Sequence, residues 1–412
     1  MTDRKIVIKF EGHYHGWLDS VLVSTATPME QAGCEDTPCK WLASAGQDPE
    51  ASVNLEVMSW NRREPLLSRI AKGDVAAVIM EAAMCNSGGI FAEPGYLEAV
   101  REACTKSGTV LIFDEVITGF RVAPGGAQSR LGVTPDLAIF AKAIANGFSV
   151  AAVAGRADMM DHLGTGRIMH GGTYNAQPIA MAAAIATMDR LCQPATFEAL
   201  ERNGARLKNG IADAFTDAGL TATVTGFPQI FTVALGLTEP ARNFRGLARM
   251  NRAGYRMFTV ALLGNGVRAL ERGAWFMSTE HDEAVVDETI AIVSQTLVEI
   301  APKIATMKTL STCGGRDDCH REPDFGRNRP KDRHDENFVN DGANPGQWGG
   351  VKSGHGDGRQ DARRGPFVRR LSGLGIRSRR SRRFPDRRRR RWPGFAPPFY
   401  RTQGSGAGPT TA

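Results

Sequence analysis

The 412-residue chain has no long apolar segment and no regular cysteine spacing. No stretch approaches the roughly 20 consecutive apolar residues of a membrane helix. The first ten residues, MTDRKIVIKF, contain too short an apolar run for a signal peptide. The seven cysteines form no CxxC pair, which predicts free thiols in a reducing compartment. We therefore expect a cytoplasmic protein without a membrane partner.

A recognisable metal-ligand pattern is also lacking. His13 and His15 lie two residues apart, but no carboxylate or thiolate stands at ligand spacing from them. Cys313, Cys319 and His320 have no evident fourth ligand. We predict no metal site, and we expect His13 and His15 to serve local structure or contacts on the substrate side.

Positive charge is concentrated at one end of the chain. The formal net charge of +7 divides into +12 for residues 311–412 and −5 for residues 1–310. Residues 309–412 are rich in Arg, Gly and Pro and poor in aliphatic side chains, which predicts a disordered tail. Nonspecific binding of this tail to nucleic acid or another anionic surface is an alternative. Because its basic residues are almost all arginine, we also hypothesise that it derives from a shifted reading frame.

The centre of the chain holds two apolar runs that end close to charged residues. The segment TVLIFDEVITGFR at 109–121 ends its apolar run at Asp114 and Glu115, and the run 137–140 stops just before Lys142. Strands that alternate with helical segments predict a parallel sheet, and such sheets bind ligands beyond the carboxyl ends of their strands. Asp114 and Lys142 are therefore predicted to face one crevice.

A lysine among alanine, isoleucine and phenylalanine has a distinctive chemistry. Desolvation disfavours the charged form of Lys142 and lowers its pKa, which yields a usable amine nucleophile. A Schiff-base lysine together with an aspartate for a pyridinium nitrogen is what pyridoxal 5'-phosphate (PLP) requires. The residues alone leave a second interpretation open, in which Lys142 directs its amine to water beside an ordinary strand-end acid.

Five sequence blocks occur in a fixed order between residues 5 and 300. They are FEGHYHGWLDS at 10–20, LIFDEVITGFR at 111–121, PDLAIFAKAIANGFSVAAVAG at 135–155, GGTYNAQPIAMAAA at 171–184 and RALERGAWFMSTEHDEAVVDETI at 268–290. In sequence and spacing they resemble the class III aminotransferases, which are PLP-dependent enzymes of fold type I. The similar branch includes glutamate-1-semialdehyde aminomutase.

The resemblance implies an α/β fold with a mostly parallel central sheet in a large domain and a smaller C-terminal α/β domain. We predict the PLP-binding large domain at 1–180, the small domain at 181–308 and the disordered tail at 309–412. Members of the family carry further residues upstream, among them a Ser-Gly-Thr turn that holds the cofactor phosphate. The large domain is therefore expected to be incomplete at its N-terminus.

The resemblance also assigns roles to individual residues. Lys142 would form the Schiff base with PLP and then act as the base, and Asp114 would pair with the pyridinium nitrogen. Tyr14 would stack on the pyridine ring, with Val116 under the opposite face. Thr173 would reach the phosphate of the neighbouring subunit's cofactor, which implies a homodimer. An alternative for Thr173 is the N-cap of the helix that follows.

A further family motif is matched only in part. In EAAMCNSGG at 81–89, Glu81 and Asn86 agree with the family pattern, whereas Ala82 and Cys85 depart from it. Glu81 would order groups around the phenolic oxygen of the cofactor or, as an alternative, cap local backbone.

The resemblance implies transfer of an amino group between an amino acid or amine and an oxo acid. GGTYNAQP is more similar to general aminotransferases, and an aminomutase-type intramolecular transfer is the alternative. A third hypothesis is an inactive, truncated remnant with a basic, anion-binding tail.

The remaining elements follow from apolar periodicity and turn residues. We predict strands at 5–10, 74–80, 221–227 and 230–237, and helices at 65–72, 94–104, 179–191, 195–219, 243–266 and 280–300, with a loop at 20–64.

Overall fold

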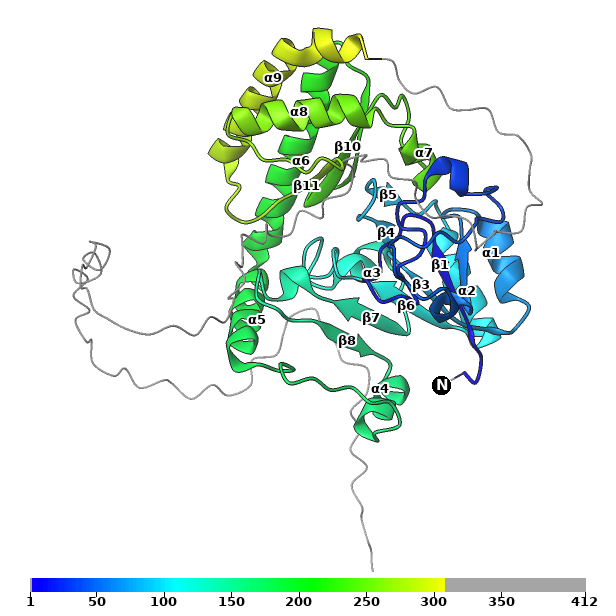
Figure 1. The fold of residues 1–412 in the computed structure, drawn as a ribbon. Helices are drawn as coiled ribbons and strands as arrows, with labels where there is room; N and C mark the ends of the chain where they lie inside the picture. The colour runs from blue at the N-terminus through cyan, green and yellow to red at the C-terminus, as the bar shows by residue number, and fades with distance from the viewer. Residues whose placement is uncertain (1, 308–412) are drawn as a thin grey trace, which may run out of the picture. The chain divides into compact units, whose positions relative to one another are not determined.

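The computed structural model describes residues 2–307; the predicted tail, with Cys313, Cys319 and His320, lies outside the described residues. The larger sheet has six strands in the order β2-β1-β3-β6-β7-β8 (Figure 1). Their bounds are β1 Ile6–Phe10, β2 Leu55–Met58, β3 Val75–Met80, β6 Val110–Asp114, β7 Leu137–Phe140 and β8 Ala152–Gly155. Every neighbouring pair is parallel except β7 and β8, which confirms the predicted, mostly parallel sheet.

Three charged residues, Glu81, Asp114 and Lys142, lie at the edge of the sheet where four adjacent strands end. Parallel strands β1, β3, β6 and β7 all end at the same edge of the sheet. Glu81 follows β3 directly, Asp114 ends β6, and Lys142 lies two residues beyond β7. The interior of this sheet is apolar and buried, as the runs VAAVIM and VLIFD require for strands covered on both faces.

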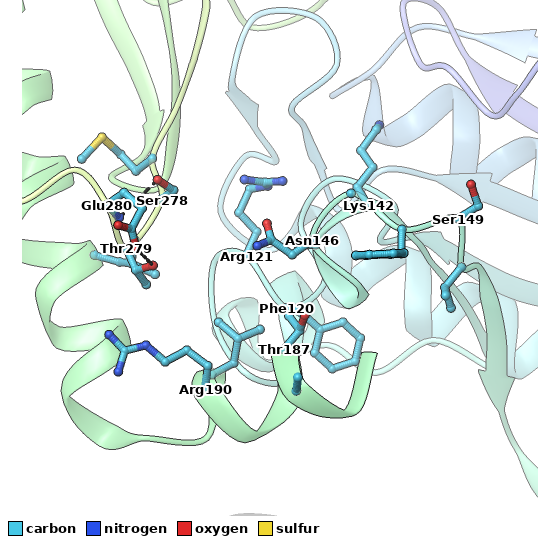
Figure 2. Close-up of a pocket in the computed structure, with 18 residues that line it drawn as sticks. Phe120, Arg121, Lys142, Asn146, Ser149, Thr187, Arg190, Ser278, Thr279 and Glu280 are labelled. Atoms are coloured by element: carbon cyan, nitrogen blue, oxygen red, sulfur yellow. Dashed lines mark hydrogen bonds between the residues drawn. The ribbon is translucent and has the colours of Figure 1, made fainter. Parts of the chain in front are cut away.

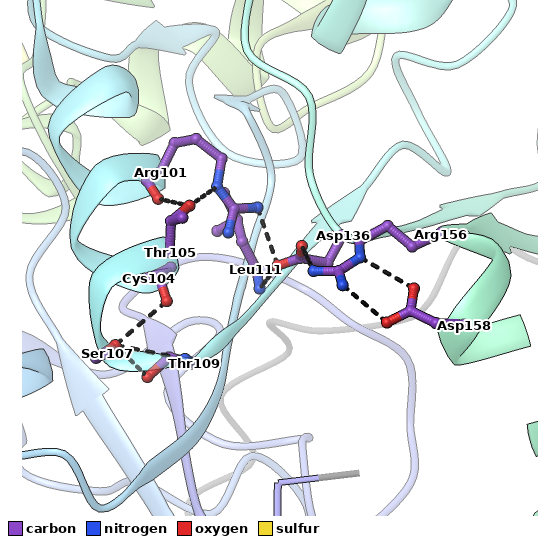
Figure 3. A network of polar contacts seen from close by, with 9 residues as sticks. All are labelled: Arg101, Cys104, Thr105, Ser107, Thr109, Leu111, Asp136, Arg156 and Asp158. Atoms are coloured by element: carbon purple, nitrogen blue, oxygen red, sulfur yellow. Dashed lines mark hydrogen bonds and ion pairs between the residues drawn. The ribbon is translucent and has the colours of Figure 1, made fainter. Parts of the chain in front are cut away.

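A buried aspartate fastens β6 to the elements beside it (Figure 3). Asp136 accepts a hydrogen bond from the Leu111 backbone N–H at 2.8 Å and from Arg101 at 2.9 Å. Its other carboxylate oxygen lies 3.2 Å from Arg156, which also pairs with Asp158. Arg101 belongs to helix α2 (Tyr96–Ser107), and Arg156 directly precedes helix α4 (Ala157–Gly164). The network therefore fixes the spacing of α2, β6 and the β8–α4 corner.

The C-terminal half of the described chain forms a second, antiparallel sheet in the order β11-β10-β9. Its strands are β9 Ala222–Phe227, β10 Ile230–Leu235 and β11 Ala274–Phe276. Helices α6 (Pro194–Asp217) and α8 (Arg252–Gly264) pack on β9 and β10, and both contact α9 (Glu283–Ala305). All six residues of β10 are buried, and one hydrophobic cluster extends from this sheet to the larger one. The predicted boundary at residue 180 stays a prediction.

Shorter elements complete the described fold. They are 3-10 helices Met29–Gln31, Pro49–Ser52 and Lys142–Ile144 (η1–η3), a two-stranded sheet of β4 Ala83–Met84 and β5 Ile90–Phe91, and helices α1 Arg63–Ile70, α3 Gly126–Leu131, α5 Pro178–Leu191 and α7 Phe244–Ala248. None of the helices among residues 2–307 is long and apolar enough to cross a bilayer.

Among the described residues, three ion pairs join the segments that carry the two sheets, and two of them are two-point contacts. Arg245 of α7 donates to both carboxylate oxygens of Glu11, directly after β1, at 2.9 Å each. Arg130 of α3 makes a similar two-point contact with Glu201 of α6 at 2.7 and 2.8 Å. A planar guanidinium that meets a carboxylate at two points fixes orientation as well as distance.

Three expectations about secondary structure need correction. The helix predicted over 243–266 is two helices, α7 and α8, because Asn251 leaves the helical path: its N–H donates to the Leu235 carbonyl and its side chain caps Gly254 N. The predicted loop 20–64 contains strand β2, which pairs with β1. The helix predicted from Pro94 begins at Tyr96, since Gly95 has a φ of 77°.

Candidate functional site

Lys142 lies in a strained backbone conformation at the edge of the main sheet. It opens the short helix η3, and its φ is 45°, in the left-handed region that costs an L-residue roughly 1–2 kcal/mol. Phe120 and Asn146, with φ of 58° and 46°, line the same pocket as Lys142. Strain held by the surrounding fold is a feature of functional sites, which makes this pocket the leading candidate.

The pocket is a cavity of about 930 Å³ between the two sheet-bearing segments (Figure 2). One wall comes from the Phe120–Arg121 turn and the 142–150 segment that follows β7. The opposite wall comes from α5 and the loop Met277–Glu280. In Figure 2, Arg121 lies between Lys142 and that loop. The size suits a small organic ligand with a few polar anchors.

The electrostatic surroundings of Lys142 favour its neutral amine. Desolvation lowers the pKa of Lys142 below its ordinary value of 10.5, although its side chain keeps access to solvent. The carboxylates of Asp114 and Glu81 raise that pKa, and Arg272 and Arg121 lower it. The amine therefore has a larger unprotonated fraction near neutral pH than an ordinary surface lysine, as a nucleophile or base requires.

Asp114 is buried and held by a histidine; it is not among the residues that line the cavity, so the predicted crevice shared with Lys142 stays a prediction. Its Oδ2 lies 2.7 Å from His15 Nδ1, and its Oδ1 accepts a 3.0 Å hydrogen bond from the Val116 backbone N–H. Burial lowers the pKa of His15, so the ring stays neutral down to a lower pH than usual. An ionised carboxylate only accepts hydrogen bonds, so Nδ1 of the neutral ring carries the hydrogen. His15 Nε2 is buried without a hydrogen-bond partner among the described residues.

Glu81 connects the segment after β1 with the segment after β3. Its carboxylate accepts hydrogen bonds from the backbone N–H groups of Tyr14 at 3.2 Å and Asn86 at 2.9 Å. The Glu81 N–H in turn donates to His13 Nδ1 at 3.0 Å. Burial raises the pKa of Glu81 to about 7. Glu81 therefore caps local backbone, one of its two predicted roles, and it orders the turn that carries Tyr14.

The partners of two residues of this region were not predicted from the sequence. His15 was expected to serve local structure or the substrate side, yet its partner is Asp114, 99 residues away. Lys9 is fully buried in β1, and its ammonium group donates to the carbonyls of His13, Val21 and Val23. Desolvation lowers the pKa of Lys9 to about 7. The alternating strand pattern KIVIKF predicted neither the partner of His15 nor the carbonyl partners of Lys9.

Thr173 stands apart from the other predicted residues. Glu81 accepts hydrogen bonds from the backbone of Tyr14 and Asn86, and Asp114 accepts one from the backbone of Val116. His15, the residue after Tyr14, joins these two groups through its contact with Asp114. The charge of Asp114 acts on Lys142. Thr173 is exposed in the turn before α5. The alternative that it caps α5 is wrong, because Gln177 is the N-cap and its side chain accepts from Ala180 N.

The side chains gathered at this edge of the sheet suit PLP as a bound cofactor. A lysine amine of lowered pKa and a buried carboxylate, fixed by histidine and backbone N–H donors, lie at one edge of the sheet. These are the groups that an aldehyde and a pyridine nitrogen need. Tyr14, 40% exposed, offers an aromatic face beside them.

Comparison with known proteins agrees with this reasoning. The model of the family Aminotransferase class-III matches residues 1–300. Glutamate-1-semialdehyde 2,1-aminomutase of Rhodopirellula baltica is 37% identical over 301 residues, 72% of this chain and 67% of that protein. The protein of the same name from Desulforudis audaxviator is 35% identical over 70% of this chain and 66% of its own length. The chain thus spans about two thirds of the length of these curated relatives.

Solved structures share the fold. An ω-transaminase from Sphaerobacter thermophilus has a TM-score of 0.67 at 32% identity, over 73% of this chain and 69% of that chain. A glutamate-1-semialdehyde aminomutase from Pseudomonas aeruginosa has a TM-score of 0.63 over 74% of this chain and 67% of that chain, and its 21% identity shows the fold alone. The predicted PLP-dependent fold is therefore confirmed. The chain belongs to the class III aminotransferase family, whose cofactor is PLP.

Proposed function

We propose that this protein is a PLP-dependent aminotransferase that moves an amino group between an amino acid or amine and an oxo acid. The observation that carries the proposal is Lys142: a strained lysine of lowered pKa in a cavity at the carboxyl edge of the sheet. When bound, PLP supplies an electron sink for the carbon next to the transferred nitrogen.

The chain's own residues divide the work of binding, orientation and proton transfer. Lys142 Nζ would hold the cofactor and would move a proton at the reacting carbon. His15 orients the Asp114 carboxylate, which would hold a proton on the ring nitrogen of the cofactor. Tyr14 and Val116 would cover the ring faces and exclude water, while Glu81 and the backbone N–H of Asn86 fix the segments beside them. Exclusion of water from this place would keep proton transfer between the substrate and Lys142 rather than solvent.

Borohydride reduction in the presence of PLP tests the role of Lys142. We expect stable mass labelling of the purified full chain, with the label on the peptide that contains Lys142. The exposed Lys72→Ala variant is the matched control and should be labelled as the wild type is. A Lys142→Ala variant that is still labelled to the same extent would refute the assignment, and an unlabelled wild type would favour the inactive remnant.

Intermolecular transfer is favoured over the aminomutase reaction by the segment GGTYNAQP at 171–178, which is more similar to general aminotransferases. The names of the curated relatives favour the aminomutase. Incubation with an amino donor and a separate oxo acid distinguishes the two reactions. Isotopic nitrogen that passes from the donor to the added oxo acid supports the aminotransferase, and nitrogen retained in a single substrate supports the aminomutase.

A homodimer is the assembly we propose. The stretch that leads into α5 and the helix itself expose apolar side chains, among them Met169 at 96% and Tyr174 at 84%, together with Ile179 and Ile185. An exposed patch of this kind is typical of an interface, and Thr173 lies within it. Light scattering on the wild type and on the double variant Ile179→Asp, Ile185→Asp tests the proposal; a monomeric wild type would contradict it.

The cytoplasm remains the predicted location. Cys39, Cys85, Cys104 and Cys192 are free thiols, which suits a reducing compartment.

A further inference from the structure

The peptide group between His13 and Tyr14 is held at both of its ends by buried charged side chains. Its oxygen, the His13 carbonyl, accepts a hydrogen bond from Lys9 Nζ at 3.0 Å. Its nitrogen, the Tyr14 N–H, donates to Glu81 Oε1 at 3.2 Å. The C=O and N–H of a trans peptide point in opposite directions, so the lysine and the glutamate lie on opposite sides of one flat group. We call this arrangement the Lys9–Glu81 clamp.

Lys9 supplies the positive end of the clamp from within β1. Its side chain is fully buried, and its ammonium group also donates to the carbonyls of Val21, at 3.4 Å, and Val23. Three carbonyl acceptors match the three hydrogens of an ammonium group. These contacts close the segment 13–23 onto β1. The turn that carries Tyr14 therefore cannot leave the sheet without breaking hydrogen bonds to a buried charge.

Glu81 supplies the negative end from the carboxyl end of β3. Its buried carboxylate accepts the Tyr14 N–H with one oxygen and the Asn86 N–H with the other. Burial lowers the pKa of Lys9, and the negative charge of Glu81 raises it. The peptide dipole has its negative end on the lysine and its positive end on the glutamate, so both charges favour the same orientation of this peptide group.

Lys40 shows a lysine of the same chain that holds backbone without such a pair. Its Nζ donates to the carbonyls of Ser52, at 3.1 Å, and Val53, at 3.4 Å, and its side chain is partly exposed. The peptide group between Ser52 and Val53 is also held at its other end, but the Val53 N–H donates to the backbone carbonyl of Glu50. A neutral carbonyl there replaces the carboxylate of the clamp.

We propose that Lys9 is a positioning residue for the cofactor site, because the Lys9–Glu81 clamp fixes the backbone of Tyr14 and thereby the place of its ring. This inference rests on the proposed aminotransferase function, in which Tyr14 would cover one face of the PLP ring. The Tyr14 side chain is 40% exposed, so packing holds it only in part and its backbone has to define its position.

The affinity for PLP, measured by visible absorbance on the full chain, tests whether Lys9 acts through Tyr14. Lys9→Met and Tyr14→Ala should each weaken PLP binding roughly tenfold. In the combined variant, Lys9→Met should add less than about a twofold loss to that of Tyr14→Ala, because the ring that it positions is already gone. Lys40→Met is the matched control and should bind PLP as the wild type does. Losses that multiply in the combined variant, or equal losses in Lys9→Met and Lys40→Met, would overturn the inference.

Hydrogen exchange of the Tyr14 amide, followed by mass spectrometry without PLP, tests the clamp itself. The amides of β10 serve as the internal reference, since they report unfolding of the buried core. Relative to this reference, the Tyr14 amide should exchange roughly tenfold faster in Lys9→Met than in the wild type, and at the wild-type rate in Lys40→Met. Equal relative rates in all three proteins would overturn the clamp.

A variant that removes both buried charges keeps the inference testable where Lys9→Met is too unstable to purify. Lys9→Met leaves Glu81 without its buried cation, so the double variant Lys9→Met, Glu81→Gln should be the more stable of the two. Its PLP affinity should again be insensitive to the addition of Tyr14→Ala. A double variant that is no more stable than Lys9→Met would show that the two side chains are not paired.

The two proposals fail separately. A wild type that does not bind PLP, together with faster exchange of the Tyr14 amide in Lys9→Met, removes the aminotransferase and leaves the clamp. PLP binding that is equally tight in the wild type and in Lys9→Met removes the positioning role of Lys9 and leaves the aminotransferase.

Discussion

His15 Nδ1 and Asp114 Oδ2 are 2.7 Å apart, although the two residues are separated by 99 positions in the chain. His15 is on the turn after β1, and Asp114 ends β6, with β3 between these strands in the sheet. Both side chains are almost fully removed from solvent. The histidine therefore holds the carboxylate in one orientation, and the turn that carries Tyr14 is fastened to the site by the same bond.

Replacement of His15 should slow amino transfer without removing any group that reacts. A hydrogen bond to a charged group contributes roughly 1.5–3 kcal/mol, so His15→Leu should reduce the single-turnover rate by about 10- to 100-fold. His15→Asn retains an N–H close to the position of Nδ1 and should recover most of the rate. Rapid-mixing measurements with one amino donor compare the variants. Equal rates in His15→Leu and the wild type would contradict a positioning role.

The backbone strain at Lys142 predicts an unusual order of stability. Glycine adopts a φ of 45° without the clash that an L-side chain meets. We expect Lys142→Gly to be more stable than Lys142→Ala by about 1 kcal/mol, with amino transfer lost in both. Denaturant unfolding at pH 7.5 measures the difference. In an unstrained helix the order is reversed, so a more stable alanine variant would show that the strain is absent.

The sequence predicted the places of Asp114 and Lys142 in the sheet better than it predicted the contacts of their side chains. Asp114 and Lys142 could be placed at one edge because the carboxyl ends of neighbouring parallel strands coincide. His15 could not be paired with Asp114, since neither spacing nor periodicity encodes a contact over 99 residues. The single helix predicted over 243–266 was wrong for a similar reason: a backbone hydrogen bond from Asn251 to Leu235 interrupts a segment that has helical periodicity throughout.

Lys9 should give the protein a pH-dependent stability above neutrality. Its folded-state pKa of about 7 is below its ordinary value of 10.5, so between these values the unfolded chain binds more protons than the folded chain. This contribution to stability is present above pH 10.5 and is lost as the pH falls towards 7. It adds a slope of about 1.4 kcal/mol per pH unit to the free energy of unfolding.

The contribution of Lys9 to this slope can be measured by comparing the pH dependence of stability in two variants with that of the wild type. Lys9→Met should lack this slope between pH 8 and 9.5, even though loss of the hydrogen bonds to His13, Val21 and Val23 also lowers its overall stability. Lys72→Met, at an exposed position, is the control and should keep the slope of the wild type. Denaturant midpoints at several pH values provide the measurement. Parallel curves for the wild type and Lys9→Met would exclude a depressed pKa at Lys9.

Asp136 should be among the more sensitive structural residues of the large sheet. Asp136 is buried and also accepts a hydrogen bond from the Leu111 N–H. Asp136→Asn weakens the pair with Arg101 and removes the charge that holds Arg156. We expect a loss of about 3 kcal/mol in the free energy of unfolding, because breaking a buried pair leaves a poorly compensated cation. Arg156→Met is the matched control; Arg156 is more than half exposed, so its loss should cost less than about 1 kcal/mol. Equal losses in the two variants, measured by denaturant unfolding, would mean that the exposed arginine rather than the buried carboxylate governs the stability of the β8–α4 corner.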